Sequence, residues 1–232
     1  MTLTSLVRTR SRALIAACTA VAALAFAVAP LTVNAAQKEK DAQASKADVA
    51  KLGEKAPDFK LTDTEGKEHK LSDFKGKFIV LEWFNPDCPY VVAQHKEGGT
   101  IKAIANKMHA MDNVVWVAIN SGAPGKQGAG LEKNKKYRAD WNIEYPILLD
   151  ETGKVGRMYE AKVTPHMYVI NPEGVLVYRG AIDNAPMGRV RGDSAEVKNY
   201  IQMAMDDIKA GRPLRDNDTK PYGCSVKYGS RN

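Results

Sequence analysis

Apolar residues occur along this chain in short runs separated by amphipathic segments. Phe78–Phe84 and Val114–Ile119 are nearly continuous apolar runs, which is typical of strands buried on both faces of a sheet. Residues 89–111 and Leu131–Trp141 follow these runs and have the pattern of helices, with glycines at 98–99 able to interrupt the first. This alternation predicts strands joined by crossover helices.

The rest of the chain adds two hairpins and a last helix. Turn residues in Asp63–Gly66 and Asn171–Gly174 each separate two short apolar segments, which predicts antiparallel pairs. The last helix is predicted to begin with Ser194 as its N-cap and to run to about Ala210. The remaining predicted elements are Phe59–Thr62, His69–Leu71, Ile147–Asp150, Val155–Tyr159, Met167–Ile170 and Val175–Arg179. The predicted fold class is α/β, a mixed β-sheet with helices on both faces.

The first residues have the composition of a targeting segment. Three arginines precede an uncharged stretch from Ala13 to about Pro30, and small residues at 33–35 suit a signal peptidase. A permanent membrane anchor is the alternative, but the stretch is near the lower limit for spanning a bilayer and Pro30 ends it. We therefore predict a signal peptide over residues 1–35 and an exported protein, periplasmic or secreted, without stable membrane insertion.

Composition divides the remaining chain into three parts. Residues 36–55 are charged, lack aromatic residues and predict a flexible tether. Folded sequence is predicted over 56–212, which is long enough for one domain with its own core, and a tail follows at 213–232. The formal charge is +7, and losing the three leader arginines leaves about +4. Lysines and acidic residues alternate without a basic stripe, so nothing predicts nucleic acid binding.

Cys88 is the candidate nucleophile. It follows the apolar run ending at Phe84 and the turn residues Asn-Pro-Asp, and it precedes Pro89, a residue favoured in the first turn of a helix. A thiol at a helix N-terminus lies among unpaired backbone N–H groups at the positive end of the helix dipole, and both favour the thiolate. The alternative is a buried, inert cysteine. We predict an ionised and accessible thiol.

Several motifs resemble the thioredoxin superfamily, within it the redoxin branch of peroxiredoxins and exported TlpA-like proteins. Gly53–Leu61 and Leu71–Lys77 resemble the entry of such domains, and Cys88-Pro89 falls where the family's attacking cysteine opens a long helix. Val163–Pro165 falls where the family places a cis-proline loop facing that cysteine. The resemblance spans about residues 52–210 and implies a thioredoxin-like fold and thiol redox chemistry. We expect no cofactor and no metal.

Two departures from the family patterns change the expected chemistry. Val91 stands where a Cys-x-x-Cys site has its second cysteine, so the nearest resolving thiol is missing. Peroxiredoxin sites have Pro-x-x-x-Thr-x-x-Cys, whereas this chain has Leu81 and Asn85 at the proline and threonine positions. A closer resemblance is to a peroxiredoxin-like group with Cys-Pro-Tyr-Val and a late Gly-Cys. We expect disulfide chemistry ahead of fast peroxide reduction.

Cys224 is the candidate resolving thiol. Cys18 falls within the predicted leader, so only Cys88 and Cys224 remain in the exported chain. The tail before Cys224 is long enough to reach Cys88, and a disulfide requires a Cα separation of about 5.5 Å. Three alternatives stay open: a reversible Cys88–Cys224 pair, a permanent structural disulfide, and a Cys224 that is free or paired with another molecule.

The predicted proline loop supplies three further candidates. Thr164 would offer backbone groups to an extended substrate segment, as in strand addition. Pro165 is predicted to be cis, the alternative being an edge turn. His166 would lie near Cys88 and stabilise its thiolate or carry a proton, the alternative being a surface histidine.

Three titratable residues flank Cys88 in sequence. Glu82, inside an apolar strand, is either a buried carboxylate that relays protons under the helix or a partly solvated side chain. His95 is two helical turns beyond Cys88, too far for direct pairing, and is predicted to be a surface or packing residue. Asp87 is predicted to cap the helix while its charge opposes thiolate formation.

These observations favour an exported thiol-disulfide oxidoreductase or weak thiol peroxidase. Its partners would be protein thiols or disulfides, with peroxides as a second oxidant, and an unidentified electron donor. The alternative function is a copper-binding, chaperone-like protein, in which Cys88, His166 and Cys224 supply soft ligands. A third possibility is a binding module whose two cysteines are permanently bridged.

Overall fold

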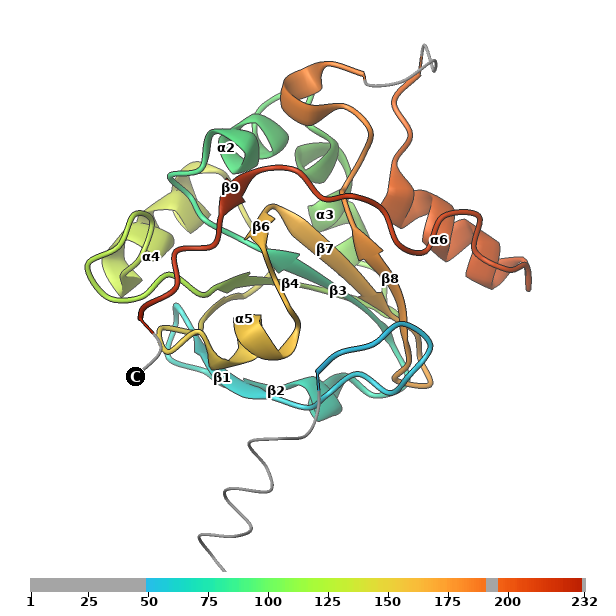
Figure 1. Ribbon diagram of the computed structural model, residues 1–232, viewed down its shortest axis with the longest axis horizontal. Helices are drawn as coiled ribbons and strands as arrows, with labels where there is room; N and C mark the ends of the chain where they lie inside the picture. The colour runs from blue at the N-terminus through green and yellow to red at the C-terminus, as the bar shows by residue number, and fades with distance from the viewer. Residues whose placement is uncertain (1–48, 191–195, 231–232) are drawn as a thin grey trace, which may run out of the picture. The chain divides into compact units, whose positions relative to one another are not determined.

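A seven-stranded mixed sheet forms the centre of the computed structural model, which describes residues 49–190 and 196–230 (Figure 1). The strand order is β2-β1-β5-β4-β3-β7-β8. The strands are β1 (Lys60–Asp63), β2 (Glu68–Lys70), β3 (Phe78–Trp83), β4 (Val114–Asn120), β5 (Ile147–Leu149), β7 (His166–Ile170) and β8 (Leu176–Gly180). β3, β4 and β5 run parallel, while β1 and β7 are antiparallel to their neighbours. The predicted mixed sheet is confirmed.

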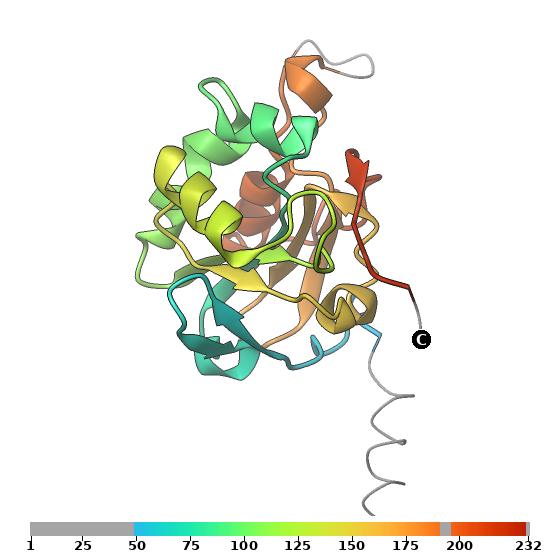
Figure 2. The ribbon, with the colours of Figure 1, turned by 90° about the vertical axis from the view of Figure 1, so that its left-hand side faces the viewer.

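Helices cover both faces of this sheet, as predicted (Figure 2). The helices are α2 (Pro89–His95), α3 (Thr100–His109), α4 (Leu131–Asp140), α5 (Lys154–Met158) and α6 (Tyr200–Lys209), with short 3-10 helices η1 (Leu71–Phe74) and η2 (Pro186–Gly188). Residues of α2, α3 and α6 pack with Val80 and Trp116 on one face. Residues of α5 and η1 pack with Leu81 and Tyr168 on the other. No described helix is both long and apolar enough to cross a bilayer.

β3 carries the chain through the centre of the sheet to the candidate nucleophile. All six of its residues are buried, and it pairs with β4 on one side and β7 on the other. Trp83 and Trp116 are fully buried, as expected of core residues. Because apolar side chains alternate between two covered faces, the strand reads as a continuous apolar run in the sequence.

Two predicted helices differ from the structure in their bounds. The segment 89–111 is two helices, because α2 ends at His95 and α3 begins at Thr100 beyond the two glycines. A Cβ on Gly99 would lie 2.3 Å from the carbonyl oxygen of Gln94, so this close approach requires glycine. The last helix begins at Tyr200, where the Asn199 side chain caps it, and the predicted cap Ser194 lies outside the described residues.

The two ends of the described chain are docked on the domain. Ala50 is buried and donates its N–H to Met158 O at 2.9 Å, and Gly53 donates to Leu176 O at 2.9 Å. The last residues assigned to the predicted tether, 50–55, therefore contact the domain; the predicted signal peptide and residues 36–48 lie outside the described residues. At the other end, β9 (Cys224–Ser225) pairs with β6 (Val163–Thr164) in a separate two-stranded sheet that the sequence did not predict.

Candidate active site

Cys88 opens helix α2, as predicted. The Asn85 side chain accepts a hydrogen bond from Asp87 N at 2.9 Å, and Cys88 N donates to Asn85 O at 3.0 Å. This turn ends β3 and reverses the chain into the helix, of which Cys88 is the N-cap residue. The carbonyl of Cys88 accepts the first helical hydrogen bond, from Val92 N at 2.9 Å. The thiol consequently lies at the end of the helix where backbone N–H groups are free.

The predicted proline loop faces this thiol. The peptide bond between Thr164 and Pro165 is cis, and Cys88 Sγ lies 3.1 Å from the carbonyl oxygen of Thr164. Cys88 has 0% of its surface exposed, however, so the prediction of an accessible thiol is wrong. Val91, at the position of a second Cys-x-x-Cys cysteine, is likewise fully buried and packs in the same core.

The C-terminal tail brings Cys224 to Cys88. In the β6–β9 pair Cys224 lies opposite Thr164, and Val226 N donates to Lys162 O at 3.1 Å (Figure 1). Both cysteines are free thiols, and the Cys224 side chain is among the groups that lower the pKa of Cys88. Of the predicted site residues, Cys88, Cys224, Thr164 and Pro165 are thus gathered at one point.

The two thiols have opposite acid–base properties. Burial opposes ionisation of Cys88, but hydrogen bonds from the Cys224 thiol, Thr164 and the backbone N–H of Val91 together lower its pKa. Burial and the hydrogen bond to Cys88 raise the pKa of Cys224 to about 11. Cys88 is therefore the more readily ionised of the two thiols, and Cys224 is the one that stays protonated.

Asp87 has a different role from the predicted one. Its carboxylate accepts a hydrogen bond from Gly128 N at 2.9 Å and forms an ion pair with Lys133. It does not cap α2, because that position belongs to Cys88. Since Lys133 offsets its negative charge, Asp87 opposes ionisation of the neighbouring thiol less than an unpaired carboxylate would.

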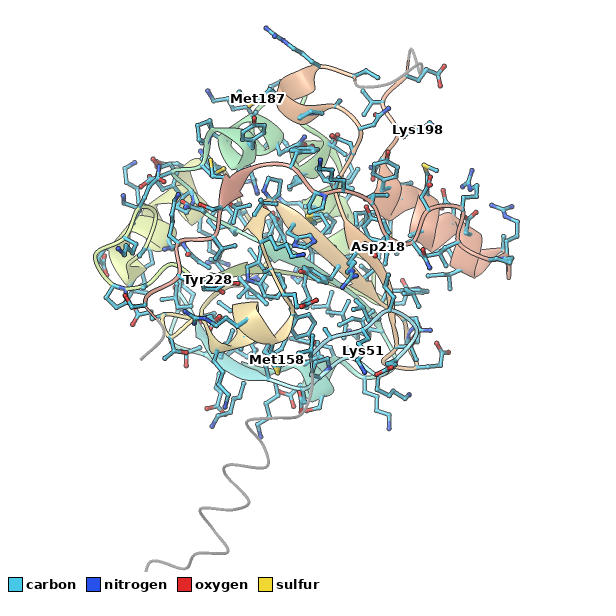
Figure 3. The ribbon with its side chains drawn as sticks, in the orientation of Figure 1. Lys51, Met158, Met187, Lys198, Asp218 and Tyr228 are labelled. Atoms are coloured by element: carbon cyan, nitrogen blue, oxygen red, sulfur yellow. The ribbon has the colours of Figure 1, made fainter. Side chains whose placement is uncertain are left out.

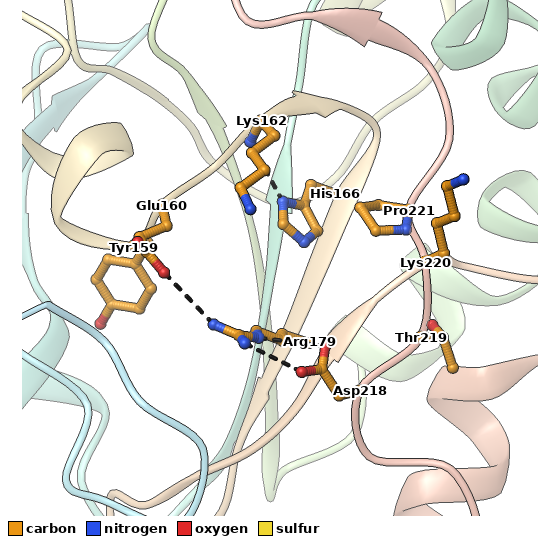
Figure 4. A pocket seen from close by; sticks show the side chains of 9 residues that line it. All are labelled: Tyr159, Glu160, Lys162, His166, Arg179, Asp218, Thr219, Lys220 and Pro221. Atoms are coloured by element: carbon orange, nitrogen blue, oxygen red, sulfur yellow. Dashed lines mark hydrogen bonds and ion pairs between the residues drawn. The ribbon is translucent and has the colours of Figure 1, made fainter.

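His166 is turned away from Cys88. Its ring hydrogen-bonds the Tyr168 hydroxyl at 2.9 Å, and within the described chain no hydrogen bond joins it to either cysteine. Burial lowers the pKa of His166 to about 3, so the ring is neutral near pH 7 and supplies no charge to a thiolate. It lies instead in a cavity of about 280 Å³ between β7, β8 and the tail, beside Arg179 and Asp218 (Figure 4). The predicted role beside Cys88 is not supported by this placement, because successive strand residues point to opposite faces.

A buried polar cluster lies under α2. Glu82 is fully buried and bonds His95 Nε2 at 2.8 Å, Trp116 Nε1 at 3.1 Å and the Tyr145 hydroxyl at 3.3 Å. The solvated alternative for Glu82 is wrong. His95 is a packing residue as predicted, stacked on Trp141 with ring centroids 5.0 Å apart. The hydrogen bond between His95 and Glu82 was not predicted, because the two residues lie 13 positions apart, one in α2 and the other in β3.

Three functional candidates escaped the sequence analysis: Gln94, Asp183 and Tyr222. Gln94 and Asp183 are buried, and both hydrogen-bond the Tyr222 hydroxyl. The only sequence signal is the position of Tyr222 two residues before Cys224. Among the residues the structure describes, no group of three or more histidine, cysteine or acidic side chains is placed to hold a metal. The three copper ligands suggested by the sequence, Cys88, His166 and Cys224, do not come together, because the His166 ring points toward Tyr168 and away from the cysteines.

Comparison with known proteins gives a family. Residues 51–199 match the family model described as Redoxin. The thiol-disulfide oxidoreductase ResA of Bacillus subtilis (strain 168) is 29% identical over 132 residues, which cover 54% of this chain and 64% of that protein. The chain thus spans less than two thirds of that relative. The ycf42 protein of Pyropia yezoensis, which carries a peroxiredoxin name, is 26% identical over 68% of this chain and 83% of its own length.

Solved structures support the thioredoxin-like fold predicted from the motifs. An uncharacterized conserved protein from Geobacillus kaustophilus has a TM-score of 0.67 and 29% identity, covering 78% of this chain and 94% of that one. A hypothetical protein from Sinorhizobium meliloti 1021 has a TM-score of 0.66 and 25% identity, covering 78% and 96%. Both similarities extend over most of the described domain.

Proposed function

Because this chain belongs to the Redoxin family, we propose that it is a thiol-dependent oxidoreductase in which Cys88 is the nucleophile and Cys224 the resolving thiol. One observation carries the proposal: β9 places Cys224 opposite Thr164, whose carbonyl oxygen lies 3.1 Å from Cys88 Sγ at the start of α2. A nucleophilic thiolate and a protonated second thiol in contact are what a two-electron thiol reaction requires.

With a disulfide substrate, the Cys88 thiolate attacks one sulfur and breaks the substrate S–S bond. This forms a mixed disulfide and releases the first substrate sulfur as a thiolate, which takes up a proton. Cys224 then loses its proton and attacks Cys88 Sγ, which releases the second substrate thiol. The substrate disulfide has gained two electrons and two protons, and the protein holds a Cys88–Cys224 disulfide. An external dithiol must reduce that bond before the next cycle.

With a peroxide, the Cys88 thiolate attacks the O–O bond, giving a sulfenic acid and releasing water or an alcohol after proton uptake. The Cys224 thiol condenses with the sulfenic acid to give the same disulfide and water. We place this reaction second, because Asn85 stands where the peroxiredoxin pattern has its threonine. Its amide oxygen already accepts from Asp87 N, and its NH₂ group donates to Gln127 O at 3.3 Å.

Polypeptide substrates would bind at the edge of β6. Thr164, the residue before the cis proline, would offer its backbone there to an extended segment, as in strand addition. In the closed state β9 occupies this edge and the tail buries Cys88. Substrate and tail therefore compete for one strand position, and the tail must leave before a protein disulfide can reach the thiolate.

We also propose that the protein works outside the cytoplasm. The support is the arginine-led apolar leader over residues 1–35. Expression with a C-terminal tag, followed by fractionation and N-terminal sequencing, tests it. Recovery of full-length protein in the cytoplasmic fraction would contradict the proposal.

Mass mapping of the purified protein tests the thiol reaction itself. The reduced protein is treated with glutathione disulfide or with hydrogen peroxide, and the products are located by peptide mass. We expect a Cys88–Cys224 disulfide in the wild type, no reaction product in Cys88→Ala, and a mixed disulfide or sulfenic acid held on Cys88 in Cys224→Ser. Full activity of Cys88→Ala would refute the proposal, and a bond that dithiothreitol fails to reduce would indicate the structural disulfide instead.

A further inference from the structure

We propose that Tyr222 is the positioning residue of this site: its hydroxyl fastens the tail to helix α2 and thereby holds Cys224 against Cys88. This inference rests on the proposed function, because a resolving thiol matters only if Cys88 is oxidised. Nothing in the chemistry of the two sulfurs themselves requires this tyrosine.

The Tyr222 hydroxyl joins the tail to two other elements. It donates to Asp183 Oδ1 at 2.5 Å and accepts from Gln94 Nε2 at 2.8 Å. Gln94 lies on α2, the helix that Cys88 opens, and it also donates to Asp183 Oδ2 at 2.9 Å. The three side chains form a closed triangle whose helical member is fixed relative to the nucleophile. Burial and the nearby Asp183 carboxylate raise the pKa of Tyr222, so the hydroxyl remains a donor.

The other two groups of the triangle are held firmly. Asp183 is 2% exposed and additionally accepts from Ala185 N at 2.8 Å and from the Thr100 hydroxyl. The Gln94 amide oxygen accepts from Thr100 N at 2.9 Å. Since every polar atom facing Tyr222 has a second partner, the tyrosine binds to a preformed site and not to mobile side chains.

Gly223, between Tyr222 and Cys224, lets the tail pass close to the backbone of Thr164. Gly223 has φ +139°, and a Cβ there would lie 2.0 Å from the carbonyl oxygen of Thr164. Only glycine therefore lets the backbone pass this oxygen and put Cys224 opposite Thr164. Tyr222 thus anchors this segment of the tail, Gly223 allows it to pass close to Thr164, and Cys224 supplies the thiol.

The tail has further attachments on either side of this segment, which provide a matched control. Asp218 pairs with Arg179, and the Tyr228 hydroxyl donates to Ala161 O at 2.8 Å; Figure 3 labels Asp218 and Tyr228 at the two ends of the docked tail. Tyr228 has the same side chain in the same tail, but its hydrogen bond goes to the α5–β6 connection and not to α2. Tyr228→Phe therefore removes one tail hydrogen bond without touching the triangle.

The experiment compares Tyr222→Phe and Tyr228→Phe by the alkylation rate of Cys88 in the reduced protein. Because Cys88 is fully buried, it reacts only while the tail is open, so the rate measures the open fraction. Loss of two hydrogen bonds at a buried charged group should raise the rate in Tyr222→Phe by about tenfold or more. In Tyr228→Phe, which loses one hydrogen bond outside the triangle, the rise should be clearly smaller. After one equivalent of hydrogen peroxide, a sulfenic acid trapped by dimedone should accumulate only in Tyr222→Phe.

A second measurement separates positioning from general loosening. The pKa of Cys88, followed by thiolate absorbance, should rise in Tyr222→Phe because Cys224, which lowers it, is no longer held beside Cys88. In a Cys224→Ala background Tyr222→Phe should leave it unchanged, since the effect passes through Cys224. Gly223→Ala serves as a second variant should Tyr222→Phe fail to fold. If Cys88 in Tyr222→Phe is alkylated at the wild-type rate, or if the rate rises equally in Tyr228→Phe, the inference is overturned. If the wild type itself forms no Cys88–Cys224 bond on oxidation, it is the proposed function that fails.

Discussion

Gly223→Ala gives the sharpest test of how the tail is held. The added Cβ would stand 2.0 Å from the carbonyl oxygen of Thr164 and 2.6 Å from its carbonyl carbon, whereas ordinary contacts begin near 3.4 Å. Both atoms belong to the backbone of the cis-proline loop, so no side-chain rotation can relieve the overlap. The tail itself must move away by more than an ångström, which breaks the β6–β9 pairing.

The size of the effect follows from two terms. Forcing a methyl group into a packed contact costs about 1–3 kcal/mol, and a non-glycine residue at this φ adds about 1 kcal/mol or more. The docking equilibrium of the tail therefore shifts by about 2–4 kcal/mol toward the open state. At 1.4 kcal/mol for each factor of ten, the open fraction rises by about 30-fold to nearly a thousandfold.

Cys88 alkylation under native conditions measures this shift directly. We expect the rate in reduced Gly223→Ala to exceed the wild-type rate by about 30-fold or to reach the rate of an exposed thiol. Gly174→Ala is the control: that glycine also has positive φ, but its Cβ would meet nothing closer than 4.0 Å. An alkylation rate for Gly223→Ala within threefold of wild type would mean that the tail is not held by this approach, and the reasoning would be refuted.

Other predictions concern the surroundings of the thiol. Glu82→Ala leaves three buried donors without their acceptor and should lower the free energy of unfolding by about 3–5 kcal/mol in urea titrations, with Glu82→Gln losing clearly less; equal losses would contradict the cluster. Asn199→Ala removes the cap of α6 and should cost about 1 kcal/mol by the same assay, whereas no loss would place the helix start elsewhere. Cys88 has a lowered folded-state pKa, so its contribution to the free energy of unfolding is present above the unfolded thiol's pKa and is lost as pH falls through the folded pKa. Cys88→Ala should remove this pH dependence of the free energy of unfolding, and an unchanged dependence would argue against the thiolate.

The position of Cys88 was predictable because its determinants are local. A buried strand, an Asn-Pro-Asp turn and a proline after the cysteine all lie within a dozen residues, and each favours the same helix start. The antiparallel hairpin around Asn171–Gly174 was predictable for the same reason. The start of α6 was not, because Ser194 and Asn199 are both acceptable caps by residue type, and the helix begins after Asn199.

The position of His166 next to Pro165 in the sequence did not place its side chain next to Cys88. It adjoins Pro165, which faces Cys88, yet a strand sends neighbouring side chains to opposite faces. Met167 packs in the core beside Cys88, while His166 points toward Tyr168 on the other side of β7. Knowing the face of one residue in β7 would have fixed all of them, but the sequence alone does not give that register.

Tyr222 and Asp183 were unpredictable for a different reason. Their contact joins residues 39 positions apart through side-chain hydrogen bonds, and no periodicity or motif encodes such a pair. The composition of the tail, rich in charged and small residues, resembles that of a disordered segment. Its order comes from specific polar contacts with the domain, such as Asp218 with Arg179, which a composition argument cannot detect.

The docked tail reconciles a buried thiol with a reactive one. Burial alone would raise the pKa of Cys88 and make it inert, yet the segment that excludes water also brings the Cys224 thiol that favours the thiolate. Covering and ionisation thus come from one structural element and are lost together when it leaves. An oxidant reaches Cys88 only when the tail is open, and a tail that recloses delivers the resolving thiol. The balance between these two events depends on how tightly residues 222–224 are held.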